Sequence, residues 1–402
     1  MRVPRTAWVA VLTVLAALAL LGASGNPRPV YDNGLARTPP MGWNDYNAHG
    51  LDVTEDVIRH SADLLVTSGL RDAGYVYVNV DDGWMAGSRD AGGNLRADPA
   101  RFPHGIRALA DYVHARGLRL GVYADAGVRT CGGLPGSLGH ERQDARQFAA
   151  WGVDYLKYDN CYAGPGCDQT SCDHGDEVAA RERYAAMRDA LADAGRPIVF
   201  SLCNWGAERV WAWGPGYGNL WRTTADLAPT YASLLAVFHA TVGLGGYAGP
   251  GGWNDPDMLE VGNGMTATED RAELSLWAAM AAPLIAGADL ATAGAATLAD
   301  LANPGVIAVD QDPLGRPARL ISAAGGLDVL ARPLANGDVA VVLFNETGTA
   351  ATITTGAARA GAPAAARYTL HDLWAGTTAT TTGPIAATVP AHGAAMFRVA
   401  KG

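Results

Sequence analysis

The chain has 402 residues, enough for a large hydrophobic core and for two or three domains. Its 40 acidic residues outnumber its 30 basic residues, which gives a formal net charge of −10 at pH 7. This charge argues against nucleic acid and anionic membranes as partners, because both are negatively charged.

The first 25 residues are typical of a secretory signal peptide. Residues 1–5 include two arginines, residues 7–21 are apolar, and residues 21–23 end in small side chains suited to cleavage. A transmembrane anchor is the competing interpretation, but the apolar stretch is shorter than the roughly 20 residues that a span needs. We therefore predict a secreted, extracellular protein, and we expect no other segment to span a bilayer.

From residue 40 to about residue 288, short apolar or aromatic runs alternate with amphipathic stretches. This alternation is the pattern of repeated βα units, and eight units of about 250 residues in total are typical of a (β/α)8 barrel. The expected strands are 41–46, 75–80, 118–124, 155–158, 198–202, 220–222, 252–254 and 284–286. The expected helices include 54–68, 105–116, 176–194, 231–241 and 268–281.

The five cysteines fit export to an oxidising compartment. Cys167 and Cys172 share one loop rich in Gly, Pro and Asp, so they are expected to close a small ring. Cys131 and Cys161 then remain as a bridge between two strand ends, with Cys203 as the free thiol. A zinc site is the alternative, although paired Cys-x-x-Cys elements are absent.

Beyond residues 310–315 the pattern becomes one of apolar and polar residues in alternation, separated by turn signals. The runs 327–330, 339–344, 351–354, 368–371 and 396–399 predict an antiparallel β-sandwich. We place this domain at residues 313–402, after a catalytic barrel at residues 26–312. The triplet Asn345-Glu346-Thr347 matches a glycosylation acceptor, which is a short and weak motif.

Most of the predicted barrel strands end in polar or aromatic residues. The carboxyl ends of parallel barrel strands meet at one face, where active sites lie, so a role in stability alone does not explain this recurrence. These strand ends carry Trp43 and Asn44, Asp81 and Asp82, Tyr123 and Asp125, Lys157 and Asp159, Cys203 and Asn204, Arg222, and Asp255 and Asp257.

Lys157 and Asp159 are two residues apart at the end of a buried strand, so their side chains project to the same side. A structural ion pair is one interpretation. The other is catalytic, with Asp159 as a nucleophile that Lys157 helps to keep ionised.

Cleavage of a sugar linkage uses two carboxyl groups, and Asp226, just beyond the sixth strand, is a suitable partner for Asp159. Asp81 and Asp82 lie beside Trp84 and suit the hydroxyl groups and the apolar face of a sugar. A divalent-metal site is the alternative there, but it lacks oxygen ligands at a recognisable spacing. The aromatic residues Trp43, Tyr123 and Trp205 are candidates either for the core or for sugar binding.

Five motifs, in this order, resemble glycoside hydrolase family 27, which contains α-galactosidases and α-N-acetylgalactosaminidases. The resemblance runs from about Leu35 to the C-terminus. The motifs are Thr-Pro-Pro-Met-Gly-Trp-Asn at 38–44, Asp-Asp-Gly-Trp at 81–84, Gly-Val-Tyr-Ala-Asp-Ala-Gly at 121–127, Leu-Lys-Tyr-Asp-Asn-Cys at 156–161 and Gly-Trp-Asn-Asp-Pro-Asp-Met at 252–258.

The resemblance implies a retaining mechanism, with Asp159 as the nucleophile and Asp226 as the acid/base. It also implies that Cys131 and Cys161 form a bridge beside the nucleophile, and that neither a metal nor an organic cofactor is needed. The residues expected to contact the terminal sugar are Trp43, Asp81, Asp82, Tyr123, Lys157, Asn204, Trp205, Arg222 and Asp257.

The sequence departs from the family pattern at two places, and the second of them bears on the substrate. Asp45-Tyr46 stands where the family usually has a small or polar residue and a tryptophan, and Asn204 stands where many α-galactosidases have glutamate. We predict an exo-acting α-galactosidase for oligosaccharides or galactomannan. The alternatives are β-L-arabinopyranosidase or α-N-acetylgalactosaminidase activity, or a non-catalytic, lectin-like barrel that binds galactose. The sequence does not predict an oligomeric state.

Overall fold

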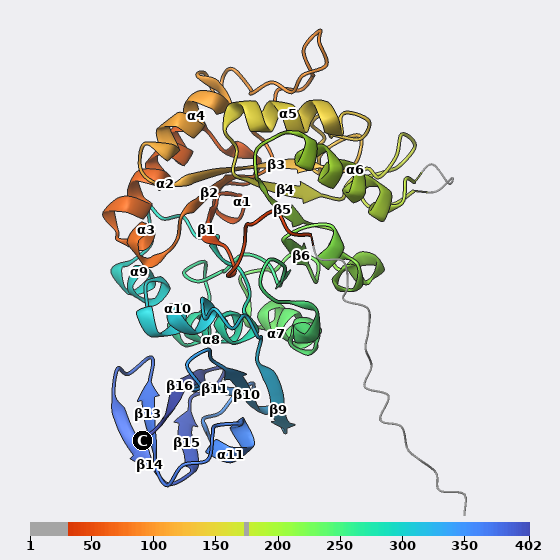
Figure 1. Ribbon diagram of the computed structural model, residues 1–402. Helices are drawn as coiled ribbons and strands as arrows, with labels where there is room; N and C mark the ends of the chain where they lie inside the picture. Colours follow the sequence, from red (N-terminus) through yellow and green to blue (C-terminus); the bar gives the residue numbers. More distant parts are fainter. Residues whose placement is uncertain (1–30, 173–176) are drawn as a thin grey trace, which may run out of the picture.

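The computed structural model describes residues 31–172 and 177–402, which fold into a (β/α)8 barrel followed by an antiparallel β-sandwich (Figure 1). The predicted fold class is therefore confirmed. The predicted signal peptide lies outside the described residues. None of the helices in the described ranges combines the length and the apolar character that a bilayer crossing requires.

Eight parallel strands form the barrel in the spatial order β7-β6-β5-β4-β3-β2-β1-β8. Leu259, beyond β7, closes the barrel by pairing with Ala286 of β8, and its N–H donates to the carbonyl of Ile285 at 2.7 Å. Each strand overlaps a predicted one. The strands are β1 (Met41–Asn44), β2 (Tyr77–Val80), β3 (Arg119–Asp125), β4 (Tyr155–Asp159), β5 (Val199–Leu202), β6 (Leu220–Arg222), β7 (Trp253–Asp255) and β8 (Leu284–Ala286).

The register of these strands brings their polar ends to the same level. Asp125 at the end of β3 pairs with Asp159 at the end of β4, and Tyr123 pairs with Lys157. The polar residues at these carboxyl ends therefore converge on one mouth of the barrel.

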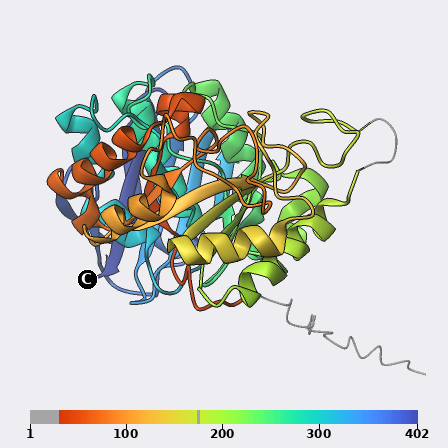
Figure 2. The same ribbon diagram turned by 90° about the horizontal axis from the view of Figure 1, so that it is seen from above.

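Amphipathic helices cover the outside of the barrel. In α4 the buried residues Ile106, Leu109, Ala110 and Val113 follow the three-to-four-residue spacing of one helix face. Figures 1 and 2 show α5 and α6 lying side by side outside β3 and β4. The helices are α1 (Tyr46–His49), α2 (Glu55–Thr67), α3 (Leu70–Ala73), α4 (Gly105–His114), α5 (Glu141–Trp151), α6 (Ala180–Asp193), α7 (Tyr231–Thr241), α8 (Ala267–Met280), α9 (Ala295–Leu301), α10 (Pro304–Asp310) and α11 (Ala357–Ala360).

The predicted helices correspond to α2, α4, α6, α7 and α8. The helix predicted at 176–194 begins at Ala180, and residue 176 lies outside the described ranges. The periodicity missed α5, in which polar and charged residues dilute the apolar face. Four short 3-10 helices complete the described elements: η1 (Gly50–Asp52), η2 (Ala207–Ala212), η3 (Gly214–Gly216) and η4 (Val242–Tyr247).

The sandwich contains a six-stranded sheet in the order β14-β13-β16-β11-β10-β9 and a two-stranded sheet of β12 and β15. The strands β9, β14 and β15 were not predicted. β9 and β14 have no buried residue, and β15 has only two large apolar residues, Ile385 and Val389. The strands are β9 (Arg319–Ala324), β10 (Leu327–Pro333), β11 (Val339–Asn345), β12 (Ala351–Gly356), β13 (Tyr368–Asp372), β14 (Thr378–Thr381), β15 (Pro384–Val389) and β16 (Ala394–Lys401).

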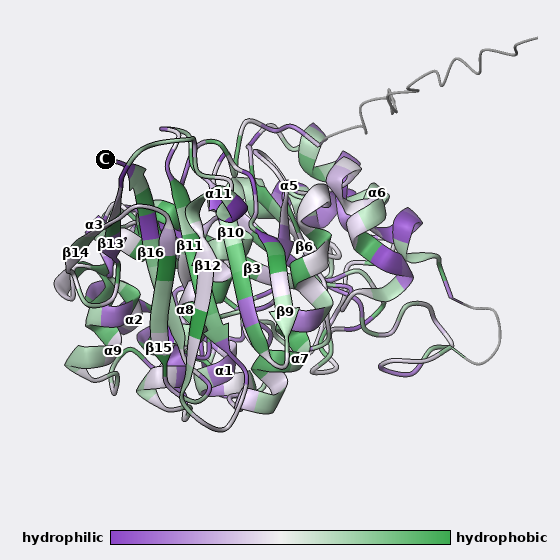
Figure 3. Ribbon diagram, turned by 90° about the horizontal axis from the view of Figure 1, so that it is seen from below, coloured by the Kyte–Doolittle hydropathy of each residue, from purple (hydrophilic) through white to green (hydrophobic). Residues whose placement is uncertain are grey.

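Strand β11 is buried on both faces because it separates two cores. Val339, Val341 and Leu343 pack in the core of the sandwich. The residues between them, Ala340, Val342 and Phe344, pack in the core that continues into the barrel. Figure 3 shows the apolar character of the neighbouring strands β10, β11 and β16, and Figure 1 shows α8 and α10 between the barrel and this sheet.

Asn345 ends β11 and is fully buried. Its side-chain Nδ2 donates to the carbonyl groups of Thr349, Val389 and Pro390. The folded protein therefore uses this amide to fix a turn, and the glycosylation match at Asn345 is not accessible in the fold.

Candidate active site

A cavity of about 660 Å³ opens at the carboxyl ends of the barrel strands. Side chains from the ends of β2, β3, β4, β5, β6 and β7 meet in it, as the register of the barrel requires. The predicted residues that line it are Asp81, Asp82, Tyr123, Lys157, Asp159, Trp205, Asp226 and Asp257. The lining also includes Tyr46, Asn47, Gln169, Thr170, Met258, Glu260 and Asn263.

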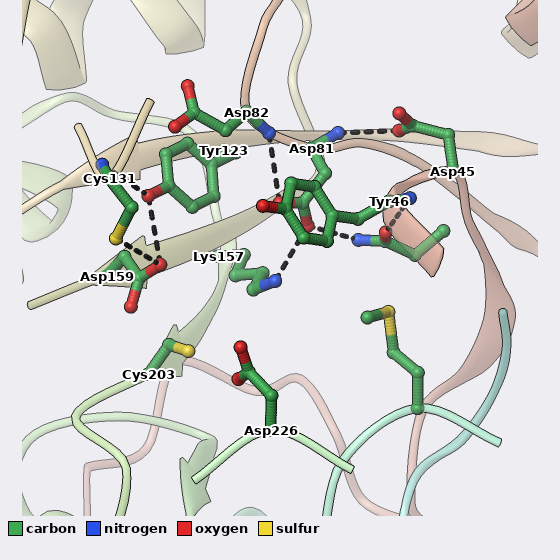
Figure 4. Close-up of polar contacts among 12 residues, drawn as sticks. Asp45, Tyr46, Asp81, Asp82, Tyr123, Cys131, Lys157, Asp159, Cys203 and Asp226 are labelled. Carbon is green, nitrogen blue, oxygen red and sulfur yellow. Dashed lines mark hydrogen bonds and ion pairs between the residues drawn. The ribbon is translucent and has the colours of Figure 1, made fainter. Parts of the chain in front are cut away.

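Asp159 ends β4 and is 7% exposed, with its carboxyl group at the cavity (Figure 4). Its Oδ2 accepts a hydrogen bond from the Tyr123 hydroxyl at 2.9 Å, and its Oδ1 accepts one from the Asn160 N–H at 3.0 Å. Burial raises the pKa of Asp159, whereas Lys157 and the Tyr123 hydrogen bond act in the opposite direction. These two groups favour the ionised form, which is the form that can attack carbon.

The disulfide between Cys131 and Cys161 lies against this carboxyl group. The Sγ of Cys131 is 3.2 Å from Oδ2 of Asp159, and the bridge joins the loop after β3 to the residue two positions beyond β4. Gly127 allows the two segments to approach, because a Cβ there would lie 1.9 Å from the carbonyl oxygen of Cys161. The expected second pair, Cys167 and Cys172, also forms.

Cys203 is the one reduced cysteine of the described residues, and it is buried. Burial and the nearby Asp159 raise the pKa of its thiol well above the usual range. The thiol therefore stays protonated, and it helps to lower the pKa of Asp159. The charge of Asp226 also raises the pKa of this thiol, so the thiol lies near both candidate carboxyl groups.

Lys157 pairs with Asp81 across strand β3. Its Nζ donates to Oδ2 of Asp81 at 2.8 Å, and the Asn44 side-chain amide donates to the same oxygen at 2.7 Å. Burial alone would lower the pKa of Lys157, but Asp81 and then Cys203 and Asp159 raise it well above its usual range. The Lys157–Asp159 ion pair considered from the sequence is thus replaced by a Lys157–Asp81 pair.

Asp82 is fixed by backbone donors. Its Oδ1 accepts from the Gly83 N–H at 2.8 Å and its Oδ2 from the Gly132 N–H at 2.7 Å. Burial raises the pKa of Asp82 to about 6, although these hydrogen bonds act against the rise. Because Lys157 and peptide donors already serve the two neighbouring carboxyl groups, the arrangement favours hydroxyl binding over the metal alternative.

Asp226 and Asp257 share the guanidinium group of Arg222. Nη2 of Arg222 lies 2.9 Å from Oδ1 of Asp226 and 2.7 Å from Oδ2 of Asp257. The Asp226 side chain is 75% exposed, whereas Asp257 is buried. Burial acts to raise the pKa of Asp226, but Arg222 and Lys157 outweigh it and lower the pKa. Burial raises the pKa of Asp257 to about 6 despite Arg222.

Asp125, Cys131 and Cys161 present ligand atoms within 4.8 Å of one another. The two sulfur atoms are joined in the disulfide, so they are not available as thiolate ligands. Asp125 instead accepts hydrogen bonds from the backbone N–H groups of Gly127 and Cys161. This cluster is therefore a structural support under Asp159.

Comparisons with known proteins agree with this geometry. The family described as alpha galactosidase A matches residues 38–312, and the alpha galactosidase C-terminal beta sandwich domain matches residues 324–399. An α-galactosidase of Cyamopsis tetragonoloba is 45% identical over 373 residues, which cover 92% of this chain and 88% of that protein. The chain belongs to the α-galactosidase family, glycoside hydrolase family 27.

Two solved structures of α-galactosidases show the same fold over most of the chain. α-Galactosidase I from Mortierella vinacea has a TM-score of 0.87 at 36% identity and covers 92% of this chain, with 98% of its own length matched. The Saccharomyces cerevisiae α-galactosidase with raffinose has a TM-score of 0.83 at 31% identity, over 93% of this chain and 99% of its own.

Six of the nine residues expected to contact the sugar line the cavity: Asp81, Asp82, Tyr123, Lys157, Trp205 and Asp257. Trp205 has a φ of 57°, a left-handed conformation that is rare for a bulky residue. The following Gly206, with a φ of 80°, would bring a Cβ within 2.3 Å of the Thr223 carbonyl oxygen. The backbone turn thus depends on glycine and turns the Trp205 indole toward the cavity.

Trp43, Asn204 and Arg222 do not line the main cavity. Trp43 is fully buried, and its indole N–H donates to the Ala288 carbonyl. Successive strand residues point to opposite sides, so Trp43 faces away from the side on which Asn44 contacts Asp81. Asn204 is also fully buried, and its amide donates to the Ala207 carbonyl. Arg222 lies one layer deeper and acts on the cavity through Asp226 and Asp257.

Several lining residues were missed by the sequence interpretation. Tyr46 is 36% exposed at the cavity, at the position where the family usually has tryptophan. An aromatic residue just past the first strand was the available signal. Gln169, Thr170, Glu260 and Asn263 come from irregular segments, whose positions no periodic pattern indicates.

Proposed function

We propose that this chain is a secreted, retaining, exo-acting α-galactosidase that removes terminal α-linked galactose from oligosaccharides or galactomannan. Hydrolysis of galactosides follows from its place in the α-galactosidase family. The proposed site rests on one observation. Asp159, at the end of β4, and Asp226, beyond the end of β6, line the same cavity.

Galactose fits the polar groups at the ends of β2 and β4. Asp81 and Asp82 offer carboxylate oxygens at the end of one strand, and Lys157 offers an ammonium donor beside them. Such a set can bind neighbouring sugar hydroxyl groups as acceptor and donor. Trp205 and Tyr46 supply aromatic surface for the apolar face of the ring.

In the first step, Asp226 donates its carboxyl proton to the glycosidic oxygen while Asp159 attacks the anomeric carbon. The bond to the leaving group breaks, the leaving alcohol departs, and a galactosyl ester of Asp159 forms. In the second step, Asp226 takes a proton from water, the water oxygen attacks the anomeric carbon, and the carboxylate of Asp159 is released.

Asp226 must hold a proton before the first step, yet the contact with Arg222 lowers its pKa. We infer that binding of substrate weakens this contact as Asp226 turns toward the glycosidic oxygen. Asp257, which binds the same guanidinium nitrogen at 2.7 Å and is itself buried, keeps Arg222 in place during that movement.

Secretion and the domain limits are part of the same proposal. The signal peptide would cover residues 1–25, the catalytic barrel residues 26–312 and the sandwich residues 313–402. Two disulfides support an oxidising compartment, since such bonds are rare in reducing ones.

The test is a panel of aryl glycosides with matched leaving groups: α-galactoside, α-N-acetylgalactosaminide and β-L-arabinopyranoside. We expect the α-galactoside to have the highest kcat/KM, and proton NMR of the first-formed sugar to show the α-anomer. A higher kcat/KM for the arabinopyranoside would overturn the substrate, and a first-formed β-anomer would overturn the retaining mechanism. Binding of galactose without turnover would support the lectin-like alternative.

A further inference from the structure

Part of the cavity lining has no role assigned at the terminal sugar. Asn47 follows Tyr46, and Met258, Glu260 and Asn263 follow Asp257; we call these four residues the second wall of the cavity. A cavity of about 660 Å³ holds more than one hexose ring, so the second wall faces space that a second sugar unit can occupy.

A buried carboxyl group organises this wall. Glu260 is 2% exposed, and each of its oxygens accepts a hydrogen bond from an amide: Oε1 from Nδ2 of Asn47 at 2.9 Å, and Oε2 from Nδ2 of Asn263 at 2.6 Å. None of the ion pairs in the described part of the chain involves Glu260. Burial raises the pKa of Glu260 to about 7, although the hydrogen bond from Asn263 acts against the rise. The two amides therefore satisfy both oxygens of this carboxyl group, with no cation beside it.

These contacts orient both amides. Both oxygens of Glu260 accept, so each asparagine turns its NH2 group toward Glu260. The carbonyl oxygens of Asn47 and Asn263 then point away from the carboxylate, and no donor among the described residues is bonded to either one. Each NH2 group also keeps a second N–H. The wall thus presents oriented acceptors and donors to the hydroxyl groups of a sugar.

Two separate segments of the backbone bring Asn47 and Glu260 together where the barrel closes. Asn47 lies in α1 after β1, and Glu260 follows Leu259, the residue that closes the barrel beside β8. The Glu260 N–H donates to Oε1 of the buried Glu273 in α8 at 2.9 Å. Residues 213 positions apart therefore meet through the fold.

We propose that Asn47 and Asn263, oriented by Glu260, form a subsite for the sugar unit on the leaving-group side of the scissile bond. This subsite rests on the proposed galactosidase function. It binds hydroxyl groups of a second sugar, and it selects oligosaccharides over aryl galactosides, which carry no hydroxyl groups at that position.

The test compares two substrates with the same terminal galactose: galactosyl-α-1,6-glucose and an aryl α-galactoside. The variants Asn47→Ala and Asn263→Ala should each lower the ratio of kcat/KM for the disaccharide to that for the aryl substrate by about fivefold, the factor that one neutral hydrogen bond supplies. Glu260→Gln, which keeps the shape but brings an NH2 group to one of the two amides, should lower the same ratio.

The matched control is Asn336→Ala, which removes an asparagine amide bonded to a carboxylate, Asp338, on the sandwich. Its ratio should equal that of the unchanged protein. An unchanged ratio in all three cavity variants would overturn the proposal, whether both activities fall together or neither falls. Lack of activity of the unchanged protein on both substrates would instead refute the proposed function itself.

Discussion

The ammonium group of Lys157 lies 2.8 Å from Oδ2 of Asp81, across strand β3 from its own strand. Lys157 and Asp81 therefore form a buried pair beside Asp159, and the two act on Asp159 in opposite directions. Lys157 lowers the pKa of Asp159, and Asp81 raises it. This opposition allows the ionisation of the proposed nucleophile to be moved either way by single substitutions.

Lys157→Met should raise the pKa of Asp159, because it removes a positive charge that stabilises the carboxylate. Asp81→Asn should lower it, because it removes a negative charge. The measurement is the rate of covalent labelling of Asp159 by an activated 2-fluorogalactosyl fluoride as a function of pH, since this reagent needs no proton from Asp226. Shifts of the same sign in the two variants would contradict the assignment.

Asp159→Asn should lower the turnover of an aryl α-galactoside by at least about 10⁴-fold, because the amide cannot form the galactosyl ester. The thermal midpoint should not fall, since Asp125 lies opposite in the register and the substitution removes a like charge from a buried pair. Near-normal activity in a folded variant would refute the nucleophile assignment.

Asp226→Ala should lower kcat/KM far more for substrates with poor leaving groups than for activated substrates. Only the former need a proton on the departing oxygen. We expect a loss of about 10²- to 10⁴-fold in kcat/KM for galactosyl-α-1,6-glucose. For an aryl galactoside with an acidic phenol, we expect a much smaller loss in the formation of the galactosyl ester. Equal losses for both substrates would argue against the acid role.

Removal of the disulfide beside the proposed nucleophile should cost both stability and activity. The Cys131–Cys161 bridge closes a loop with a sequence separation of 30, for which chain entropy predicts about 3–4 kcal/mol. The double variant Cys131→Ser/Cys161→Ser should therefore unfold at lower denaturant and lose turnover. The matched control is Cys167→Ser/Cys172→Ser, which opens a ring with a separation of only 5 and should be affected less. Equal effects would contradict the positioning role of the first bridge.

Asp328 should make the protein less stable as the pH rises toward neutrality. Burial and the adjacent Glu346 raise the pKa of Asp328 to about 7, and His239 from α7 acts in the opposite direction. Its unfolded pKa is about 3.9, so the folded state binds more protons between about pH 4 and 7 and stability falls across that window.

Asp328→Asn should therefore reduce the fall in thermal midpoint between pH 5 and pH 8 by about 2 °C or more. The control is Asp56→Asn, which changes an exposed carboxyl group on α2. An unchanged pH dependence in Asp328→Asn would show that this carboxyl group does not titrate in the window.

The strand ends of the barrel were predictable because parallel strands of a barrel share one register, so Asp159, Asp226 and Asp257 had to meet. The wrong predictions concern residues that lie next to one that does face the barrel mouth. Trp43 and Asn204 lie beside Asn44 and Cys203, and only one of two successive residues faces the barrel mouth. The pairing of Lys157 with Asp81 depends on side-chain reach across β3, which the sequence pattern does not describe.

The sandwich was predictable where its strands pack against a core on both faces, as in β11. Its exposed strands β9 and β14 are rich in small or polar residues and have little hydrophobic patterning. The second wall of the cavity was missed for a different reason. Glu260 and Asn263 lie in an irregular segment, and their approach to Asn47 arises only when the barrel closes.

Helix α8 buries ten of its fourteen residues, because the barrel lies on one side of it and strands β11 and β16 lie on the other. A chain cut at residue 312 would expose the apolar face of α8 to solvent and aggregate. A transfer of the barrel to another protein should therefore include the sandwich. Gly402, exposed at the far end of the sandwich, is the better point for attaching a fusion partner or a surface anchor (Figure 1).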